Sequence, residues 1–257
     1  ILLTLSDGKL LISDATDPNV PFDRLPYWCL NEKGLIIRKK DALWVDLQSP
    51  LPSENSRIIT YKIYPNAQEA EVTCLNHTTE VEAYFLRDQY HDDTTSLKEA
   101  FLEKGFVKIN RIKTSHYDDT GGPYVVAIKG TIKIEQLEDL LLISPLLKFP
   151  VSSLPFTQKV RTYPIDFITS QIEKYTSQII IPQGYFVEFK PEDLKISNEL
   201  VDIEYSTLAK DTILEVNAVI HFKKAIYPES DYAKLQFYYK KIVEKFNEQI
   251  IFKQNKT

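Results

Sequence analysis

The feature that most constrains this chain is the alternation of apolar and polar residues in short segments that end at turn residues. In Arg57–Tyr64, the side chains of Ile59, Tyr61 and Ile63 fall on one face of an extended strand. Fifteen Tyr and thirteen Phe against only seven Gly also favour strands. Further segments with strand character follow along the chain: Ala70–Leu75, Phe106–Ile112, Tyr124–Ile134, Ser177–Ile181, Tyr185–Phe189, Leu200–Tyr205 and Ile213–Phe222.

Three segments carry helical signals instead. Thr79 and Glu82 have the spacing of a capping box, and Ser96 and Glu99 repeat that spacing. Near the end of the chain, after a predicted N-cap at Ser230, apolar residues recur every three or four positions. These are Tyr232, Leu235, Tyr239, Ile242, Val243, Phe246 and Ile250. We predict an α+β fold dominated by antiparallel β, sandwich-like, with two or three helices that include a C-terminal amphipathic helix.

The best linker signal lies in Gln48–Ser56, which contains two Pro and three Ser and has no apolar period. A second stretch rich in loop residues runs from Pro145 to Pro164. We therefore predict three parts, namely residues 1–52, a β-rich α+β subdomain at 53–165, and an antiparallel β-sandwich at 166–257 that the terminal helix closes.

Composition and charge exclude several classes of partner. The net charge is −5 and Lys and Arg are dispersed among Asp and Glu, so a nucleic-acid partner is not expected. The longest apolar run, Leu140–Ile143 with Leu146 and Leu147, is far shorter than the roughly 20 residues of a membrane span. The chain contains no Met and begins inside an apolar segment, Ile1–Leu5, which is typical of the middle of a longer protein.

Cysteine and histidine are sparse. Cys29 and Cys74 can form one disulfide or remain two buried thiols, and the sequence favours thiols. His91-Asp92-Asp93 and His116-Tyr117-Asp118-Asp119 contain residue types that bind metals, but they lack the spacing of a metal site and lie in predicted turns. We expect no metal and no cofactor.

The first segment carries a more specific pattern. Ser6–Pro18 reads SDGKLLISDATDP, in which Ser6–Lys9 supplies a turn between two short strands. This pattern resembles the closing hairpin of a transglutaminase-like core, a fold related to papain. The similarity continues through Pro21–Pro26. At the other end, Tyr227–Tyr232 and Phe246–Ile251 resemble the end of a domain of unknown function that follows such cores in bacterial proteins.

The resemblance implies a Cys-His-Asp triad in which Asp14 is the residue that orients the His. The Cys and His of the family would lie before Ile1, and neither Cys29 nor Cys74 has the family's nucleophile context. A thiol needs an adjacent imidazole, and the imidazole needs a carboxylate, so Asp14 is at most one third of a triad. Without the resemblance, an Asp before Ala-Thr can simply cap a turn.

Three functions follow as hypotheses. The first is a non-catalytic accessory region that positions substrate for, or tethers, the upstream catalytic core of the same polypeptide, a transglutaminase-like cysteine peptidase or amide transferase. The second is a binding or scaffold module of the cell envelope whose upstream core is inactive. The third, an independent enzyme, lacks a convergent site. The resemblance also implies a bacterial envelope location, periplasmic or exported, and a protein or peptidoglycan-like substrate.

Overall fold

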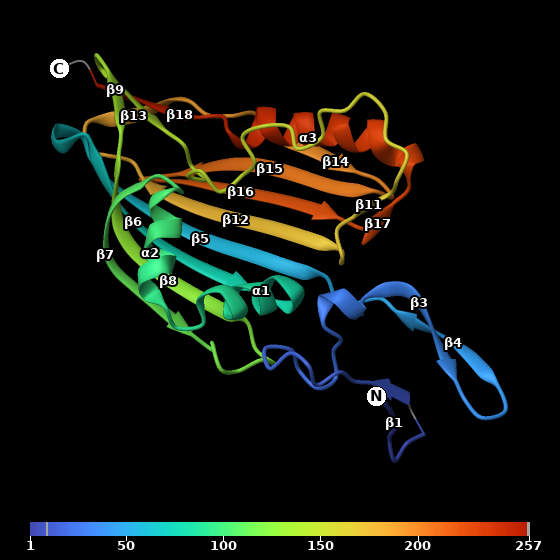
Figure 1. The fold of residues 1–257 in the computed structure, drawn as a ribbon. Helices are drawn as coiled ribbons and strands as arrows, with labels where there is room; N and C mark the ends of the chain where they lie inside the picture. Colours follow the sequence, from blue (N-terminus) through green and yellow to red (C-terminus); the bar gives the residue numbers. More distant parts are fainter. Residues whose placement is uncertain (9, 256–257) are drawn as a thin grey trace.

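The computed structural model describes residues 1–8 and 10–255, and its centre is an eight-stranded sheet (Figure 1). The strand order is β14-β15-β16-β12-β5-β6-β8-β7, and neighbours are antiparallel except for β5 and β12. The strands are β5 (Ser53–Tyr64), β6 (Glu69–Thr78), β7 (Phe106–Ser115), β8 (Tyr124–Lys133), β12 (Gln171–Ile180), β14 (Leu194–Ser197), β15 (Val201–Lys210) and β16 (Ile213–Phe222).

The parallel pair joins two stretches that are far apart in the sequence. β5 and β12 run side by side over ten paired residues, from Gln171 opposite Ser53 to Ile180 opposite Lys62. The sheet therefore takes four strands from each side of the boundary that the sequence predicted near residue 165. The predicted boundary therefore passes through one continuous sheet.

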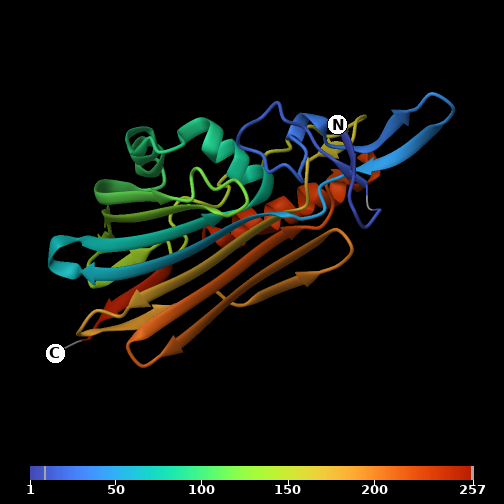
Figure 2. The ribbon, with the colours of Figure 1, turned by 90° about the horizontal axis from the view of Figure 1, so that it is seen from below.

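Three α-helices of the described residues lie on one face of this sheet (Figure 2). The first two, α1 (Glu80–Tyr90) and α2 (Thr94–Leu102), contact β5, β8 and β7, and α3 (Tyr232–Phe246) contacts β15. The predicted α+β class, rich in antiparallel β and ending in an amphipathic helix, is confirmed. Sandwich packing of residues 166–257 stays a prediction.

The helix ends differ from the sequence signals by a few residues. Asp93 caps α2, because its carboxylate accepts hydrogen bonds from the amides of Thr95 and Ser96. The last helix begins after Asp231 and ends at Phe246. Ile250 continues the helical spacing but lies in a strand, where it is buried and pairs with Ile143.

Smaller sheets complete the fold. One has the order β13-β18-β10-β9, and a two-residue pair joins β11 to β17. Their bounds are β9 (Glu135–Leu137), β10 (Leu140–Ile143), β11 (Ile165–Asp166), β13 (Tyr185–Phe189), β17 (Ile226–Tyr227) and β18 (Ile250–Gln254). Leu141, Ile143, Ile250 and Phe252 of the four-stranded sheet belong to the same apolar core as the main sheet.

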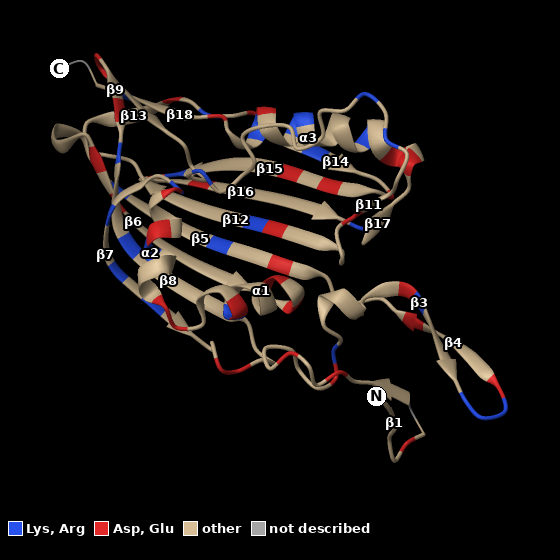
Figure 3. Ribbon diagram, viewed as in Figure 1, with Lys and Arg blue, Asp and Glu red and all other residues tan. Residues whose placement is uncertain are grey.

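The face of the main sheet opposite the helices is polar. Acidic and basic residues are interspersed along its strands (Figure 3). Cross-strand ion pairs on this face include Lys174 with Glu54 at 2.7 Å and Lys129 with Glu71 at 3.0 Å. Such mixed charge keeps one face of an antiparallel sheet in contact with water while the other is buried.

The first 52 residues form two separate hairpins. β1 (Leu2–Thr4) pairs with β2 (Leu10–Ile12), as predicted, and Gly8 takes a positive φ of 82° in the turn. Lys9 of that predicted turn lies outside the described residues. The second hairpin, β3 (Asn31–Ile37) with β4 (Ala42–Leu47), projects away from the main sheet (Figures 1 and 2). In the predicted linker, Ser53–Ser56 already belongs to β5.

Candidate functional site

Asp14 follows β2 by two residues and is bonded to its own loop. Its Oδ1 accepts a hydrogen bond from the Thr16 amide at 2.8 Å and another from the Thr16 hydroxyl. These two bonds lower the pKa of Asp14 below its usual value, so the carboxylate is ionised at neutral pH. The local geometry is that of an Asx turn, the alternative that the sequence left open. A catalytic role of Asp14 stays a prediction.

The second oxygen of this carboxylate faces a thiol. Cys29 Sγ lies 3.9 Å from Asp14 Oδ2, and Cys29 closes a short 3₁₀ turn at Tyr27–Cys29. Burial first, and then the neighbouring carboxylate, raise the pKa of Cys29. A thiol in this environment stays protonated, which is the opposite of what a cysteine nucleophile requires.

Cys74 is unreactive for a different reason. It is fully buried in β6, and burial raises the pKa of its thiol to about 12. Both cysteines are free, so no disulfide joins them. The sequence favoured two thiols, and this is confirmed, although Cys29 is half-buried, not buried.

The two His-Asp segments of the sequence come together in space. His91 Nε2 lies 2.9 Å from Asp118 Oδ1, and His116 Nδ1 lies 3.4 Å from Asp119 Oδ2. These are exposed pairs, and each joins one imidazole to a carboxylate. Within the described part of the chain, no group of three or more His, Cys, Asp or Glu side chains is placed to hold a metal ion.

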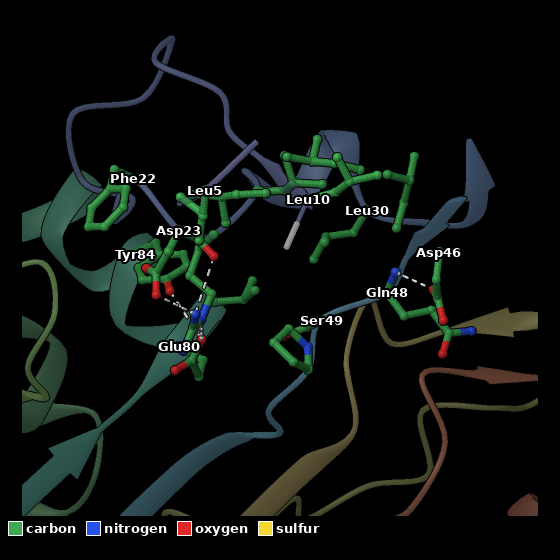
Figure 4. A pocket seen from close by; sticks show the side chains of 17 residues that line it. Leu5, Leu10, Phe22, Asp23, Leu30, Asp46, Gln48, Ser49, Glu80 and Tyr84 are labelled. Carbon is green, nitrogen blue, oxygen red and sulfur yellow. Dashed lines mark hydrogen bonds and ion pairs between the residues drawn. The ribbon is translucent and has the colours of Figure 1, made fainter. Parts of the chain in front are cut away.

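A pocket of about 490 Å³ opens between the N-terminal segment and α1 (Figure 4). We call it the N-terminal pocket. Leu5, Leu10 and Leu30 form its apolar side. At the α1 end, Glu80 Oε2 accepts hydrogen bonds from Arg24 Nε at 3.1 Å and from the Tyr84 hydroxyl at 3.2 Å. Asp14 does not line this pocket.

The N-terminal pocket holds fixed charges but no activated nucleophile. Arg24 also pairs with Asp23 at 2.9 Å, so its guanidinium is neutralised by two carboxylates. Burial raises the pKa of Tyr84, and the adjacent Glu80 raises it further, so the phenol stays a hydrogen-bond donor. The arrangement can position a polar group through the Tyr84 hydroxyl and the charges of Arg24 and Glu80.

A Ser-His-Asp contact that sequence reasoning missed lies at one end of the main sheet. Ser170 Oγ is 3.0 Å from His221 Nε2, and His221 Nδ1 is 3.5 Å from Asp202 Oδ2. However, Ser170 donates its single hydroxyl proton to the Phe222 carbonyl at 2.9 Å, so the imidazole donates to the serine and does not accept from it. That direction is the reverse of general-base activation.

Sequence reasoning also missed a polar cluster on the helix-covered face. The inward phase that Ile59, Tyr61 and Ile63 define on β5 continues backwards to Arg57 and Asn55. Extending the alternation by two steps would have placed these side chains inside the protein. A charged residue at an inward position is the signal for such a cluster.

No curated protein matches the chain. Residues 139–252, from β10 to β18, match a family described as "Domain of Unknown Function with solved-structure structure (DUF3858)". The predicted domain of unknown function is thus confirmed for this part of the chain. A solved structure described as "a putative protease" from Parabacteroides distasonis ATCC 8503 is similar at 12% identity and a TM-score of 0.39. That likeness covers 45% of this chain but only 24% of the other, and it carries no argument about fold or function.

Proposed function

We propose that this chain is a non-catalytic accessory region of a transglutaminase-like cysteine peptidase or amide transferase. In this proposal, residues 1–52 contact a catalytic core in the same polypeptide, and residues 53–257 tether that core or position its substrate. A protein or a peptidoglycan-like polymer in a bacterial envelope is the proposed substrate. The resemblance of Ser6–Pro18 to a closing hairpin motivates this reading.

The observation that carries the proposal is the exposed apolar surface of the β3–β4 hairpin. The side chains of Ile37 and Trp44 are 80% and 64% exposed, and Leu35, which pairs with Trp44 on the same face of the hairpin, is also exposed. A two-stranded hairpin is at best marginally stable alone, and contiguous exposed apolar side chains mark interaction surfaces. Residues 53–255 bury a large core of their own, so the apolar hairpin is not needed to complete it.

Asp14 fits the proposal as a residue that would orient a histidine supplied by the core. It stands just after β2, its carboxylate is ionised, and Thr16 fixes its orientation. A triad Asp acts by accepting a hydrogen bond from the imidazole and keeping it in the correct tautomer.

Hydrogen exchange on two forms of the protein tests the proposal. One form is this chain, and the other is the same chain extended upstream through the catalytic core. We expect fast exchange in β3 and β4 of the short form and clear protection in the extended form, while β5 and β6 exchange slowly in both. Equal exchange of the hairpin in both forms would contradict the proposed contact.

The activity of the extended form distinguishes the proposed accessory role from the second hypothesis, a module whose upstream core is inactive. In the extended form, Asp14→Asn should lower amide turnover by roughly 10³–10⁴-fold, whereas Asp211→Asn, at the exposed turn between β15 and β16, should leave it unchanged. Absence of labelling by a thiol-directed substrate analogue in the extended form would favour the scaffold reading instead.

A further inference from the structure

A second cavity, of about 200 Å³, lies between the main sheet and helices α1 and α2. We call it the helix–sheet cavity. Its sheet side is polar, with Asn55, Arg57 and Asn76 from β5 and β6. Its helix side is mostly apolar, with Leu86 of α1 and Phe101 of α2. A polar wall under two helices is unusual because this face of the sheet is otherwise the apolar core.

The polar wall is one chain of hydrogen bonds that begins at a charged pair. Arg57 forms an ion pair with Glu173. Glu173 also accepts a hydrogen bond from Asn55 Nδ2 at 3.1 Å. Asn55 Oδ1 then accepts from the Thr78 hydroxyl at 2.8 Å, and Thr78 Oγ1 accepts from Asn76 Nδ2 at 3.2 Å. Rings of Phe149 and Tyr175, 4.7 and 5.3 Å from the guanidinium carbon, hold the arginine plane in place.

Glu173 fixes which group donates and which accepts along this hydrogen-bond network. The Glu173 carboxylate can only accept, so Asn55 must present its amide nitrogen there and its oxygen to Thr78. Thr78 has one hydroxyl proton and gives it to Asn55, so it must accept from Asn76. The oxygen of Asn76 is therefore the group left over. The network therefore allows one orientation of the Asn76 side-chain amide, the one that leaves Oδ1 as an unpaired acceptor at the cavity wall.

Two buried groups of the wall remain without a hydrogen-bond partner among the described residues, namely Asn76 Oδ1 and Arg57 Nε. Asn76 is only 6% exposed and the Arg57 side chain 12%. They are direct cross-strand partners, so their Cβ atoms lie about 5 Å apart on one face of the sheet. A trans peptide group points its N–H and C=O to opposite sides. One residue of an extended peptide, however, turns its own N–H and C=O to the same side, and this pair matches one acceptor beside one donor.

The rest of the lining indicates which side chain the bound peptide residue can carry. Leu86, Leu97, Phe101 and Val126 supply apolar contact, and Glu82, Tyr90 and Lys104 also line the cavity. Burial, and then Glu173, raise the pKa of Glu82, and Lys104 adds a positive charge, so the cavity disfavours a cationic ligand. For comparison, an apolar cavity of about 150 Å³ holds a benzene molecule. The volume of the helix–sheet cavity therefore admits one peptide residue with a small apolar side chain.

We propose that the helix–sheet cavity binds one residue of an extended peptide together with the apolar side chain of that residue. The Arg57 Nε–H donates to the carbonyl of the bound residue, and Asn76 Oδ1 accepts from the N–H of the same residue. Leu97 and Phe101 surround the apolar side chain. The site is independent of the proposed catalytic partner, because the residues that form it belong to β5, β6, β8, β12, α1 and α2 or to the loops at Lys104 and Phe149.

A matched pair of small probes tests the proposal on the whole chain. N-acetylleucine N-methylamide carries two secondary amides, and its analogue with both nitrogens methylated carries the same carbonyls and side chain but no N–H. We expect the first probe to bind with a Kd in about the millimolar range and to shift the NMR signal of Arg57 Nε–H. The second should bind at least about tenfold more weakly, because Asn76 Oδ1 stays unpaired.

Variants and a sugar probe complete the test. Asn76→Ala should abolish the difference between the two peptide probes, whereas Thr73→Ala, on the exposed face of the same strand, should preserve it. Equal binding of both peptide probes by the unmodified chain would overturn the proposal, even if Asn76→Ala does not fold. So would an Arg57 signal that shifts with N-acetylglucosamine and not with the peptide.

Discussion

Replacing Phe246 with alanine measures how much the terminal helix contributes to the fold. Phe246 is 1% exposed, and its ring contacts those of Tyr205 and Tyr175 at centroid distances of 5.7 and 6.4 Å. Removing a buried Phe side chain costs roughly 3–5 kcal/mol of unfolding free energy. The two edge-to-face contacts account for about 0.5–1.5 kcal/mol each within that cost. At about 2–4 °C per kcal/mol, we expect the Tm to fall by roughly 6–20 °C.

Phe237→Ala on the same helix is the matched control. Phe237 is 53% exposed, and among the aromatic rings and cations of the described residues its ring contacts only Tyr238 and Lys241. Its replacement should change the unfolding free energy by less than about 1 kcal/mol. Urea unfolding of both variants and the parent gives the comparison. A loss below about 1 kcal/mol for Phe246→Ala, or equal losses for the two variants, would refute packing of this helix on the sheet.

Three further predictions concern other parts of the chain. Arg87 is 1% exposed, and its Nη2 donates to the carbonyls of residues 116, 119 and 122. In urea titration, Arg87→Leu should therefore lower the unfolding free energy by at least about 2 kcal/mol, whereas Arg111→Leu, at an exposed position, should not. Cys29 should react with a thiol reagent in the native protein, and Cys74 only after unfolding. Mass spectrometry of the labelled peptides measures this, and labelling of Cys74 in the native protein would contradict its burial. Limited proteolysis should cut first within residues 48–52, since Ser53 onwards is paired in β5, and a first cut within β16 would contradict this.

Local patterns were sufficient to predict most of the strands and helices. The alternation in β5 appears at the predicted place, and α1 begins after Thr79 as its spacing with Glu82 predicted, although the Thr79 side chain makes no capping hydrogen bond. The hairpin of β1 and β2 was predictable for the same reason, because a short turn fixes which residues pair. The failure at Ile250 shows the limit of periodicity, since Ile250 keeps the helical spacing after Asn247 has ended the helix.

Long-range pairing could not be predicted from such patterns. The contact of β5 with β12 joins residues more than a hundred positions apart, and nothing in either strand specifies a parallel partner. The contact of Ser170 with His221 and the network from Glu173 to Asn76 both depend on that pairing or on the strands beside it. The candidate site at Asp14 was identified by resemblance, and its hydrogen bonds to Thr16 are those that local turn chemistry predicts.

The inward face of β5 has an apolar half and a polar half. Ile59, Tyr61 and Ile63 are buried among apolar neighbours and contribute through the hydrophobic effect. Arg57, two residues earlier, is buried as an ion pair whose desolvation cost can exceed its Coulombic gain. An apolar residue at that position would stabilise the sheet as well or better, so stability alone does not explain the arginine. The proposed peptide site supplies a reason for the arginine, because a donor beside an acceptor can pair with the C=O and N–H of one peptide residue.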